Sequence, residues 1–143
     1  AGVHHGKKDN YIKSDVLEFL KSFEIRVATL ECAIGDKPSF DPEKMVRKQD
    51  IVYAPTSDLY RVKEMGIDVV SLANNHAFDL GEEGLINTCK QLDKLGIKYC
   101  GAGLNSEEAS RPAVVTFAGV SIAFLVHIVL ILSDSNGFWF DLY

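Results

Sequence analysis

The sequence is poor in cysteine, and its cysteines are not arranged in pairs. The 143 residues include three of them, Cys32, Cys89 and Cys100, and none forms a CxxC motif. An odd number at these spacings excludes a closed disulfide framework. We therefore expect buried free thiols. Cys32 follows Glu31, but a small apolar core residue is the expected role of a free cysteine.

Positive charge is also scarce. The chain has 15 lysines and arginines against 20 acidic residues, giving a net charge of -5 and a pI near 5.3. The only basic dipeptide near the start, Lys7-Lys8, is too short to neutralise a phosphate backbone, so general nucleic-acid binding is not expected. An apolar content of 47% and interspersed charges predict one globular domain.

The chain shows no secretory signal, because residues 1–10 lack an apolar segment behind their charges. One apolar stretch, residues 113–132, is long enough to suggest a membrane span. It follows Pro112 and includes Thr116, Ser121 and His127. We favour two strands joined by a tight turn at Ala118-Gly119, and a membrane-anchored fragment is the alternative.

Hydrophobic periodicity predicts an α/β fold with repeated βα units. Gly66-Ile67 and Gly96-Ile97 each mark the end of a helix and the start of a strand, as in a parallel sheet. We expect a layered domain over residues 15–132 with a mixed sheet and a terminal hairpin, after a flexible or divergent segment 1–14 and before a tail 133–143. The predicted helices cover residues 15–23, 55–65, 84–95 and 107–110, and the predicted strands residues 25–30, 67–72, 97–100 and the hairpin 114–125. Residues 35–42 resemble a loop, and residues 45–53 show no clear pattern.

Polar side chains gather where the strand 67–72 ends. The segment 71–79 contains Asn74, Asn75, His76 and Asp79, and Glu31 ends the preceding strand. Ligands of parallel α/β sheets bind outside the carboxyl ends of strands, because loops there share one crevice. We therefore expect the functional site at this edge.

These residue types suit a divalent metal ion. Asn75 offers a carbonyl oxygen, His76 an imidazole nitrogen and Glu31 an anionic oxygen. Together they make half of a metal site, and further ligands must come from elsewhere. Asp79, three positions beyond His76, could accept the other imidazole N–H and so orient the ring.

Simpler interpretations remain open for each of these residues. Asn74-Asn75 is favourable in a turn, Asp79 could cap a helix that begins near Gly81, and His76 could be solvated.

Two other features have a simple explanation. His127 is most simply a buried neutral histidine and His4-His5 a frayed end or tag remnant. Gly101-Ala102-Gly103 lacks the spacing of a dinucleotide-binding loop, so no such cofactor is expected.

Several segments resemble a known family. They are Leu30-Glu31-Cys32, the stretch from Asp68 to Gly81 that contains Asn-Asn-His-x-x-Asp, Gly101-Ala102-Gly103 with Arg111-Pro112, and the stretch from Val120 to Leu125. Together they resemble the bacterial capsule-synthesis proteins of CapA type, the poly-γ-glutamate capsule family. The resemblance runs from about residue 15 to residue 125.

The resemblance implies a fold and a chemistry. The family is similar to calcineurin-like metallophosphoesterases, which stack sheets between helices and hold two metal ions at strand ends. By this resemblance Asn75 and Glu31 are metal ligands, His76 and Asp79 belong to the catalytic group, and Asn74 lies at the substrate. The implied cofactors are divalent ions (Mn, Zn, Mg or Fe), up to two. The implied partners are an anionic polymer or phosphoester and membrane-associated capsule machinery, in an extracytoplasmic or cell-surface setting.

The sequence also departs from the family pattern. The opening strand that ends in Gly-Asp has no counterpart before Asp15, and the histidines of the later half are missing. The chain therefore resembles roughly the N-terminal half of such a protein. Two functions compete: a metal-dependent phosphoesterase-like enzyme of capsule assembly, and a non-catalytic binding or scaffold module for an anionic polymer or partner protein.

Overall fold

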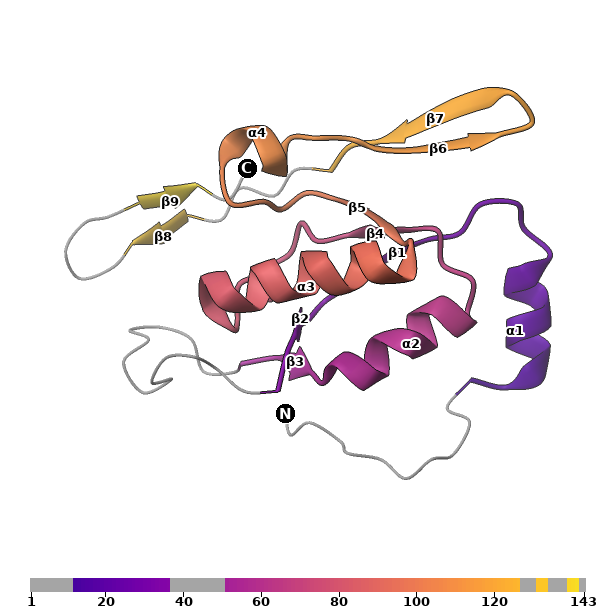
Figure 1. The fold of residues 1–143 in the computed structure, drawn as a ribbon, viewed down its shortest axis with the longest axis horizontal. Helices are drawn as coiled ribbons and strands as arrows, with labels where there is room; N and C mark the ends of the chain where they lie inside the picture. The colour runs from indigo at the N-terminus through magenta and orange to yellow at the C-terminus, as the bar shows by residue number, and fades with distance from the viewer. Residues whose placement is uncertain (1–11, 37–50, 127–130, 134–138, 142–143) are drawn as a thin grey trace.

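A computed structural model describes residues 12–36, 51–126, 131–133 and 139–141 of the chain (Figure 1). Helices and strands are interspersed as far as α4, and the described elements after it are strands. The helices are α1 (Ser14–Lys21), α2 (Thr56–Glu64), α3 (Gly81–Leu95) and α4 (Ser106–Ala109). The strands are β1 (Val27–Thr29), β2 (Ala33–Ile34), β3 (Tyr53–Ala54), β4 (Val69–Ser71), β5 (Lys98–Cys100), β6 (Ala113–Phe117), β7 (Val120–Phe124), β8 (Ile131–Ser133) and β9 (Trp139–Asp141).

The centre of the fold is a parallel sheet in the order β1-β4-β5. Helices α2 and α3 pack on one of its faces (Figure 1). Val70 of the middle strand is fully buried there, in a cluster with Leu59 of α2 and Leu85 and Leu92 of α3. The apolar stripes of the two helices and the continuous apolar run of β4 therefore form one core.

The β6–β7 hairpin packs against the opposite face of the sheet. Ala113 of the hairpin joins Val69 and Cys100 in a second buried cluster. The two strands are antiparallel, and their turn places Ala118 and Gly119 at positive φ, 49° and 81°. The predicted tight hairpin is confirmed.

The hairpin also contradicts a transmembrane helix over residues 113–132, because residues 113–117 and 120–124 are strands. Within the described parts of the chain, no helix combines the length and the apolar character that a membrane span requires.

A short parallel pair, β2 with β3, was not predicted. It lies beside α3, which holds it through side chains. Thr88 Oγ1 accepts a hydrogen bond from the Ile34 N–H at 2.9 Å, and Asn87 Nδ2 donates to the Ile34 carbonyl at 2.7 Å. Thr88 is only 1% exposed, so this contact ties the pair to the core.

The predicted α/β class is confirmed, with one correction. We expected a mixed sheet with a terminal hairpin, but among the described residues the parallel and antiparallel strands belong to separate hydrogen-bonded sheets. The expected loop over residues 35–42 lies almost wholly outside the described residues, as do His4, His5 and His127. Arg26 and Asp68 join the starts of β1 and β4, with Asp68 Oδ2 accepting from the Arg26 backbone at 2.8 Å and from its Nε at 3.2 Å.

Candidate functional site

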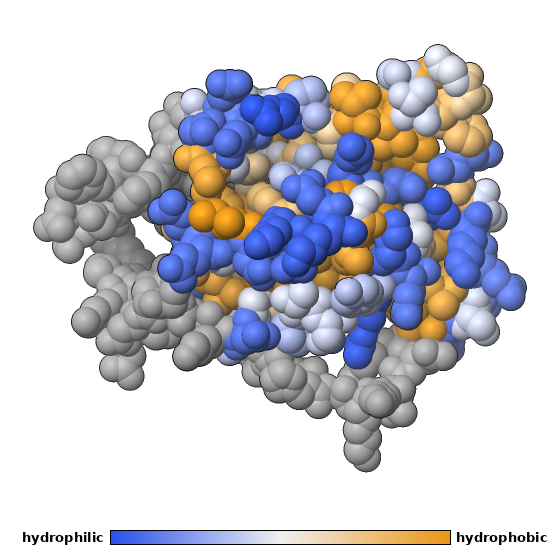
Figure 2. Space-filling view, viewed as in Figure 1, coloured by the Kyte–Doolittle hydropathy of each residue, from blue (hydrophilic) through white to orange (hydrophobic). Residues whose placement is uncertain are grey.

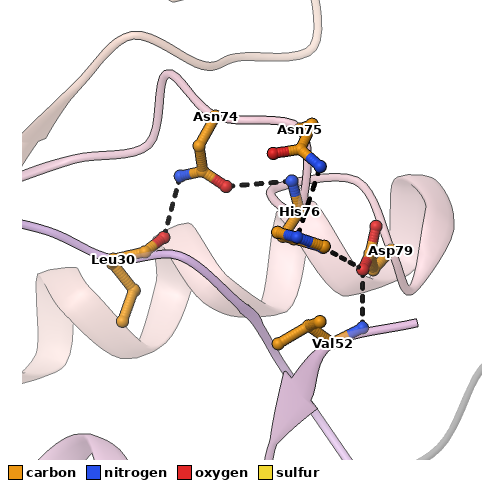
Figure 3. Close-up of polar contacts among 6 residues, drawn as sticks. All are labelled: Leu30, Val52, Asn74, Asn75, His76 and Asp79. Carbon is orange, nitrogen blue, oxygen red and sulfur yellow. Dashed lines mark hydrogen bonds and ion pairs between the residues drawn. The ribbon is translucent and has the colours of Figure 1, made fainter. Parts of the chain in front are cut away.

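The candidate site is the loop that connects β4 to α3, residues 72–80, which we name the 72–80 loop (Figure 3). Asn74 fixes its start. The Asn74 amide donates from Nδ2 to the Leu30 carbonyl at 2.9 Å, and Asn74 Oδ1 accepts from the His76 backbone N–H at 2.9 Å. Through these two hydrogen bonds the Asn74 side chain joins the end of β1 to the loop. Asn74 is only 5% exposed. A contact between Asn74 and substrate stays a prediction.

Asp79 holds the His76 ring in place. His76 Nδ1 lies 2.8 Å from Asp79 Oδ2, and the same oxygen accepts the Val52 N–H at 2.6 Å (Figure 3). Asp79 is fully buried, whereas 21% of the His76 side chain is exposed. The predicted orientation of His76 by Asp79 is therefore confirmed.

The alternative role of Asp79, as a helix cap, is wrong. Helix α3 begins at Gly81, and its N-cap residue is Leu80, which makes no side-chain capping hydrogen bond. The reason is that Asp79 points toward His76 and Val52 instead of toward the first N–H groups of the helix.

The hydrogen bonds decide which imidazole nitrogen carries the proton. Asp79 Oδ2 already accepts from Val52, so it acts as an acceptor and Nδ1 must be the donor. In the neutral ring Nε2 then has a free lone pair. Asn75 Nδ2 lies 3.2 Å from Nε2 and donates to it (Figure 3). Asn75 itself is exposed on the loop.

Glu31 lies close to the loop along the backbone. Its neighbour Leu30 donates its N–H to the Ser71 carbonyl at 3.0 Å, which places the ends of β1 and β4 side by side. The Glu31 side chain is exposed, and no hydrogen bond holds it to another described residue. Convergence of Glu31 with Asn75 and His76 on one cation stays a prediction.

Cys32 is not activated as a nucleophile. Burial, and to a smaller extent the charge of Asp58, raises the pKa of the Cys32 thiol above its ordinary value. A raised pKa keeps the thiol protonated at neutral pH, and the thiolate is the reactive form. All three cysteines are free thiols, as predicted, but only Cys100 is buried, and Cys32 and Cys89 are partly exposed.

Sequence reasoning missed the two backbone groups that complete the site. The Val52 N–H and the Leu30 carbonyl are separated from their partners by 27 and 44 residues. Val52 lies in the segment without a recognisable pattern, and main-chain groups leave no residue-type signal. Nothing in the sequence could have identified Val52 as the second donor to Asp79.

Comparisons with known proteins identify the family of the chain. The family model described as Bacterial capsule synthesis protein PGA_cap matches residues 2–136. Two Sinorhizobium fredii proteins, y4sH and y4uA, are each 27% identical over 113 residues, which is 78% of this chain and 24% of theirs. The capsule biosynthesis protein CapA of Bacillus anthracis is 38% identical over 64 residues, 45% of this chain and 16% of that protein.

The extent of the match settles the family. The family model begins at residue 2, ahead of the residue 15 where the resemblance was expected to start, and reaches residue 136. The chain spans about a quarter of the length of the Sinorhizobium proteins that it matches. The chain belongs to the bacterial capsule synthesis family PGA_cap.

Proposed function

We propose that this chain takes part in the assembly of a capsule or related exopolymer at the cell surface, and that the 72–80 loop acts on a phosphoester or another anionic group of that polymer. One observation carries the proposal. His76 is partly exposed at the carboxyl end of the sheet, and the buried Asp79 fixes its ring with Nε2 toward the exposed Asn75. Family membership supplies the capsule context, and the name of the Bacillus relative points the same way.

The resemblance to metallophosphoesterases implies divalent metal ions, and the donor set fits them in part. Asn75 Oδ1 and His76 Nε2 are suitable donors, and Glu31 is a suitable carboxylate. Among the described residues, no three His, Cys, Asp or Glu side chains come close enough together to hold an ion. In this proposal the described residues therefore supply part of the ligands of a metal site, and the others come from elsewhere. A bound ion would supply charge stabilisation at a transferring phosphoryl group and activate water.

The residues of the loop have roles that do not depend on the ion. Asp79 keeps the Nδ1 hydrogen in place, so that Nε2 can accept a proton or coordinate. Asn75 lies beside Nε2 and can donate its amide hydrogens to an anionic oxygen. Asn74 and the Leu30 carbonyl keep the loop at the end of β1, which preserves the spacing between these groups.

Manganese titration followed by ¹H–¹⁵N NMR tests the metal part of the proposal. Paramagnetic Mn²⁺ should broaden the signals of Asn75 and His76 first. Asp79→Asn should weaken Mn²⁺ binding by roughly 10- to 100-fold, as measured for residues that orient metal-bound histidines. Gln91→Ala on α3 is the matched control and should leave the broadening unchanged. Broadening confined to other parts of the chain would refute a metal site at the loop.

Hydrolysis of a chromogenic phosphodiester in the presence of Mn²⁺ tests the catalytic part. His76→Ala should abolish any activity that the wild-type chain shows. The same assay on a longer relative, such as the Bacillus capsule protein with its corresponding histidine replaced, controls for ligands that lie outside this chain. Activity that survives both replacements would exclude His76 as a catalytic residue.

A binding or scaffold module remains the second candidate. The loop is held by four side-chain hydrogen bonds among Leu30, Val52, Asn74, His76 and Asp79, a rigidity that recognition without turnover also requires. Calorimetry with Mn²⁺ separates the two functions. Equal heats for the wild type and for Asn75→Ala/His76→Ala would favour the scaffold.

A further inference from the structure

A groove of about 820 Å³ lies between α3, β5 and the segment that leads from α4 into β6. Its lining residues fall between Leu85 and Val114, so it is separate from the 72–80 loop. Buried apolar side chains, among them Leu85, Ala102 and Ala113, form its floor. In the space-filling view, hydrophilic side chains cover α3 and hydrophobic surface covers the hairpin (Figure 2).

Cations dominate the rim of this groove. Lys90, Lys94, Lys98 and Arg111 line it and are exposed, and the acidic lining residues are Asp93 and Glu108. The lining therefore carries two net positive charges in a chain whose net charge is -5. A locally positive groove on an acidic protein favours an anionic ligand over a cationic one.

The contacts that the rim cations make among the described residues are weak enough for an anionic ligand to replace them. Glu108 Oε2 is already occupied by the Leu104 N–H at 3.0 Å. Arg111 lies 3.5 Å from Glu107, but both side chains are mostly exposed, and such pairs contribute little. Among the described residues, Lys94 makes only a long contact of 3.4 Å to Gln91, so a ligand can replace this contact at small cost.

The polar groups deeper in the groove are neutral. Burial raises the pKa of Tyr99 and of Cys89, and the charges of Asp93 and Glu108 raise both further. At neutral pH these two groups therefore carry no charge, and the Tyr99 hydroxyl does not repel an anion. An apolar, uncharged floor beneath a cationic rim suits a ligand with an aliphatic body and charged ends.

The geometry of α3 sets the spacing of two cations. Lys90 and Lys94 are one helical turn apart, about 6 Å along the axis, and so lie on the same side of the helix. Lys98 projects from β5, and Arg111 from the segment after α4. The groove volume lies within the range of roughly 300–1,000 Å³ that small-molecule sites occupy.

We propose that this groove binds an organic anion that combines an aliphatic body with two or more carboxylate or phosphate groups. The body lies over the apolar floor around Leu85 and Ala102, and its charged groups pair with Lys90, Lys94, Lys98 and Arg111. The proposal does not depend on the activity of the 72–80 loop.

Three probes of equal length test the chemistry: the dicarboxylate azelate, its diphosphate analogue and its neutral diol analogue. Each is titrated into the ¹⁵N-labelled chain. The two anions should shift the amide signals of the groove residues, and the diol should not. The anion that binds more tightly identifies the charged group. Equal shifts with the diol, or anion shifts confined to another surface, would overturn the proposal.

Charge reversal tests the cations themselves. Lys90→Glu/Lys94→Glu should weaken binding of the preferred anion by at least about tenfold, since two favourable ion pairs are lost and repulsion is added. The matched control is Lys21→Glu/Lys63→Glu, which makes the same change at exposed lysines of α1 and α2. All four positions are exposed, so both variants should fold. Equal affinities of the two variants would refute the proposed role of the rim.

Discussion

Replacing Asp79 with alanine removes the acceptor that joins the 72–80 loop to Val52. Two hydrogen bonds end on Asp79 Oδ2, from the Val52 N–H at 2.6 Å and from His76 Nδ1 at 2.8 Å, and the carboxyl group is fully buried. A hydrogen bond to a charged group contributes about 1.5–3 kcal/mol, and a buried donor left unpaired costs about 1–3 kcal/mol. Because the two bonds share one oxygen, we expect a loss of about 3 kcal/mol in the free energy of unfolding.

Urea unfolding followed by circular dichroism measures this loss. In a thermal scan the same change corresponds to a fall of roughly 10 °C in Tm for a domain of this size. Asp58→Ala is the matched control, because 41% of the Asp58 side chain is exposed and it lies 3.8 Å from Arg61, an arrangement that contributes under about 1 kcal/mol. A loss at Asp79 no larger than the loss at Asp58 would show that the network does not stabilise the fold.

The variant Asp79→Asn replaces one carboxylate oxygen by an amide NH2 and keeps the shape and one oxygen acceptor. Because the Val52 N–H and His76 Nδ1 contact the same oxygen, an asparagine oxygen at that position can accept from both. The neutral ring should therefore keep its proton on Nδ1, and nitrogen NMR shifts of the imidazole report the tautomer directly. An Nε2–H tautomer in the wild-type chain would refute the assignment made from the hydrogen bonds.

Two further predictions concern stability. Burial raises the pKa of Cys100 and of Tyr99, so the folded state holds these protons more tightly than the unfolded state. The two groups therefore add to the free energy of unfolding. This contribution is complete below the ordinary thiol pKa of 9.0 and is lost as pH rises through the folded pKa values. The free energy of unfolding should therefore fall between pH 9 and pH 11 in urea titrations, and a constant value over that range would contradict the burial. In a typical helix, replacing glycine by alanine is stabilising. Gly84→Ala should instead destabilise the protein by roughly 1–3 kcal/mol, because a Cβ at this position would lie 2.1 Å from the Leu80 Cβ. A rise in Tm would contradict that close packing.

Local sequence patterns predicted most of the elements. Apolar spacing at helical period gave α2 and α3, and the continuous apolar run before Leu72 gave β4. The Gly66-Ile67 and Gly96-Ile97 boundaries are confirmed, since both glycines adopt the positive φ that ends a helix. These features depend on residues within a few positions of one another, which a single sequence displays.

The β2–β3 pair escaped prediction because its stability does not come from local pattern. Each strand has two residues, too few for an alternation to be visible. Thr88 holds Ile34 from 54 positions away. A hydrogen bond between such distant residues exists only after the chain has folded.

For the candidate site, the sequence alone determined the position of the polar loop after a buried strand and the three-residue spacing that lets Asp79 reach His76. Only the tertiary structure decided which proton the imidazole carries, because that depends on the Val52 N–H, 27 positions away, occupying the same oxygen. It also decided that Asn74 joins the loop to Leu30 across 44 positions, and that four separate cations share one groove. The sequence determines which chemical groups the side chains carry. Which groups they contact depends on how the sheet packs between its helices and its hairpin.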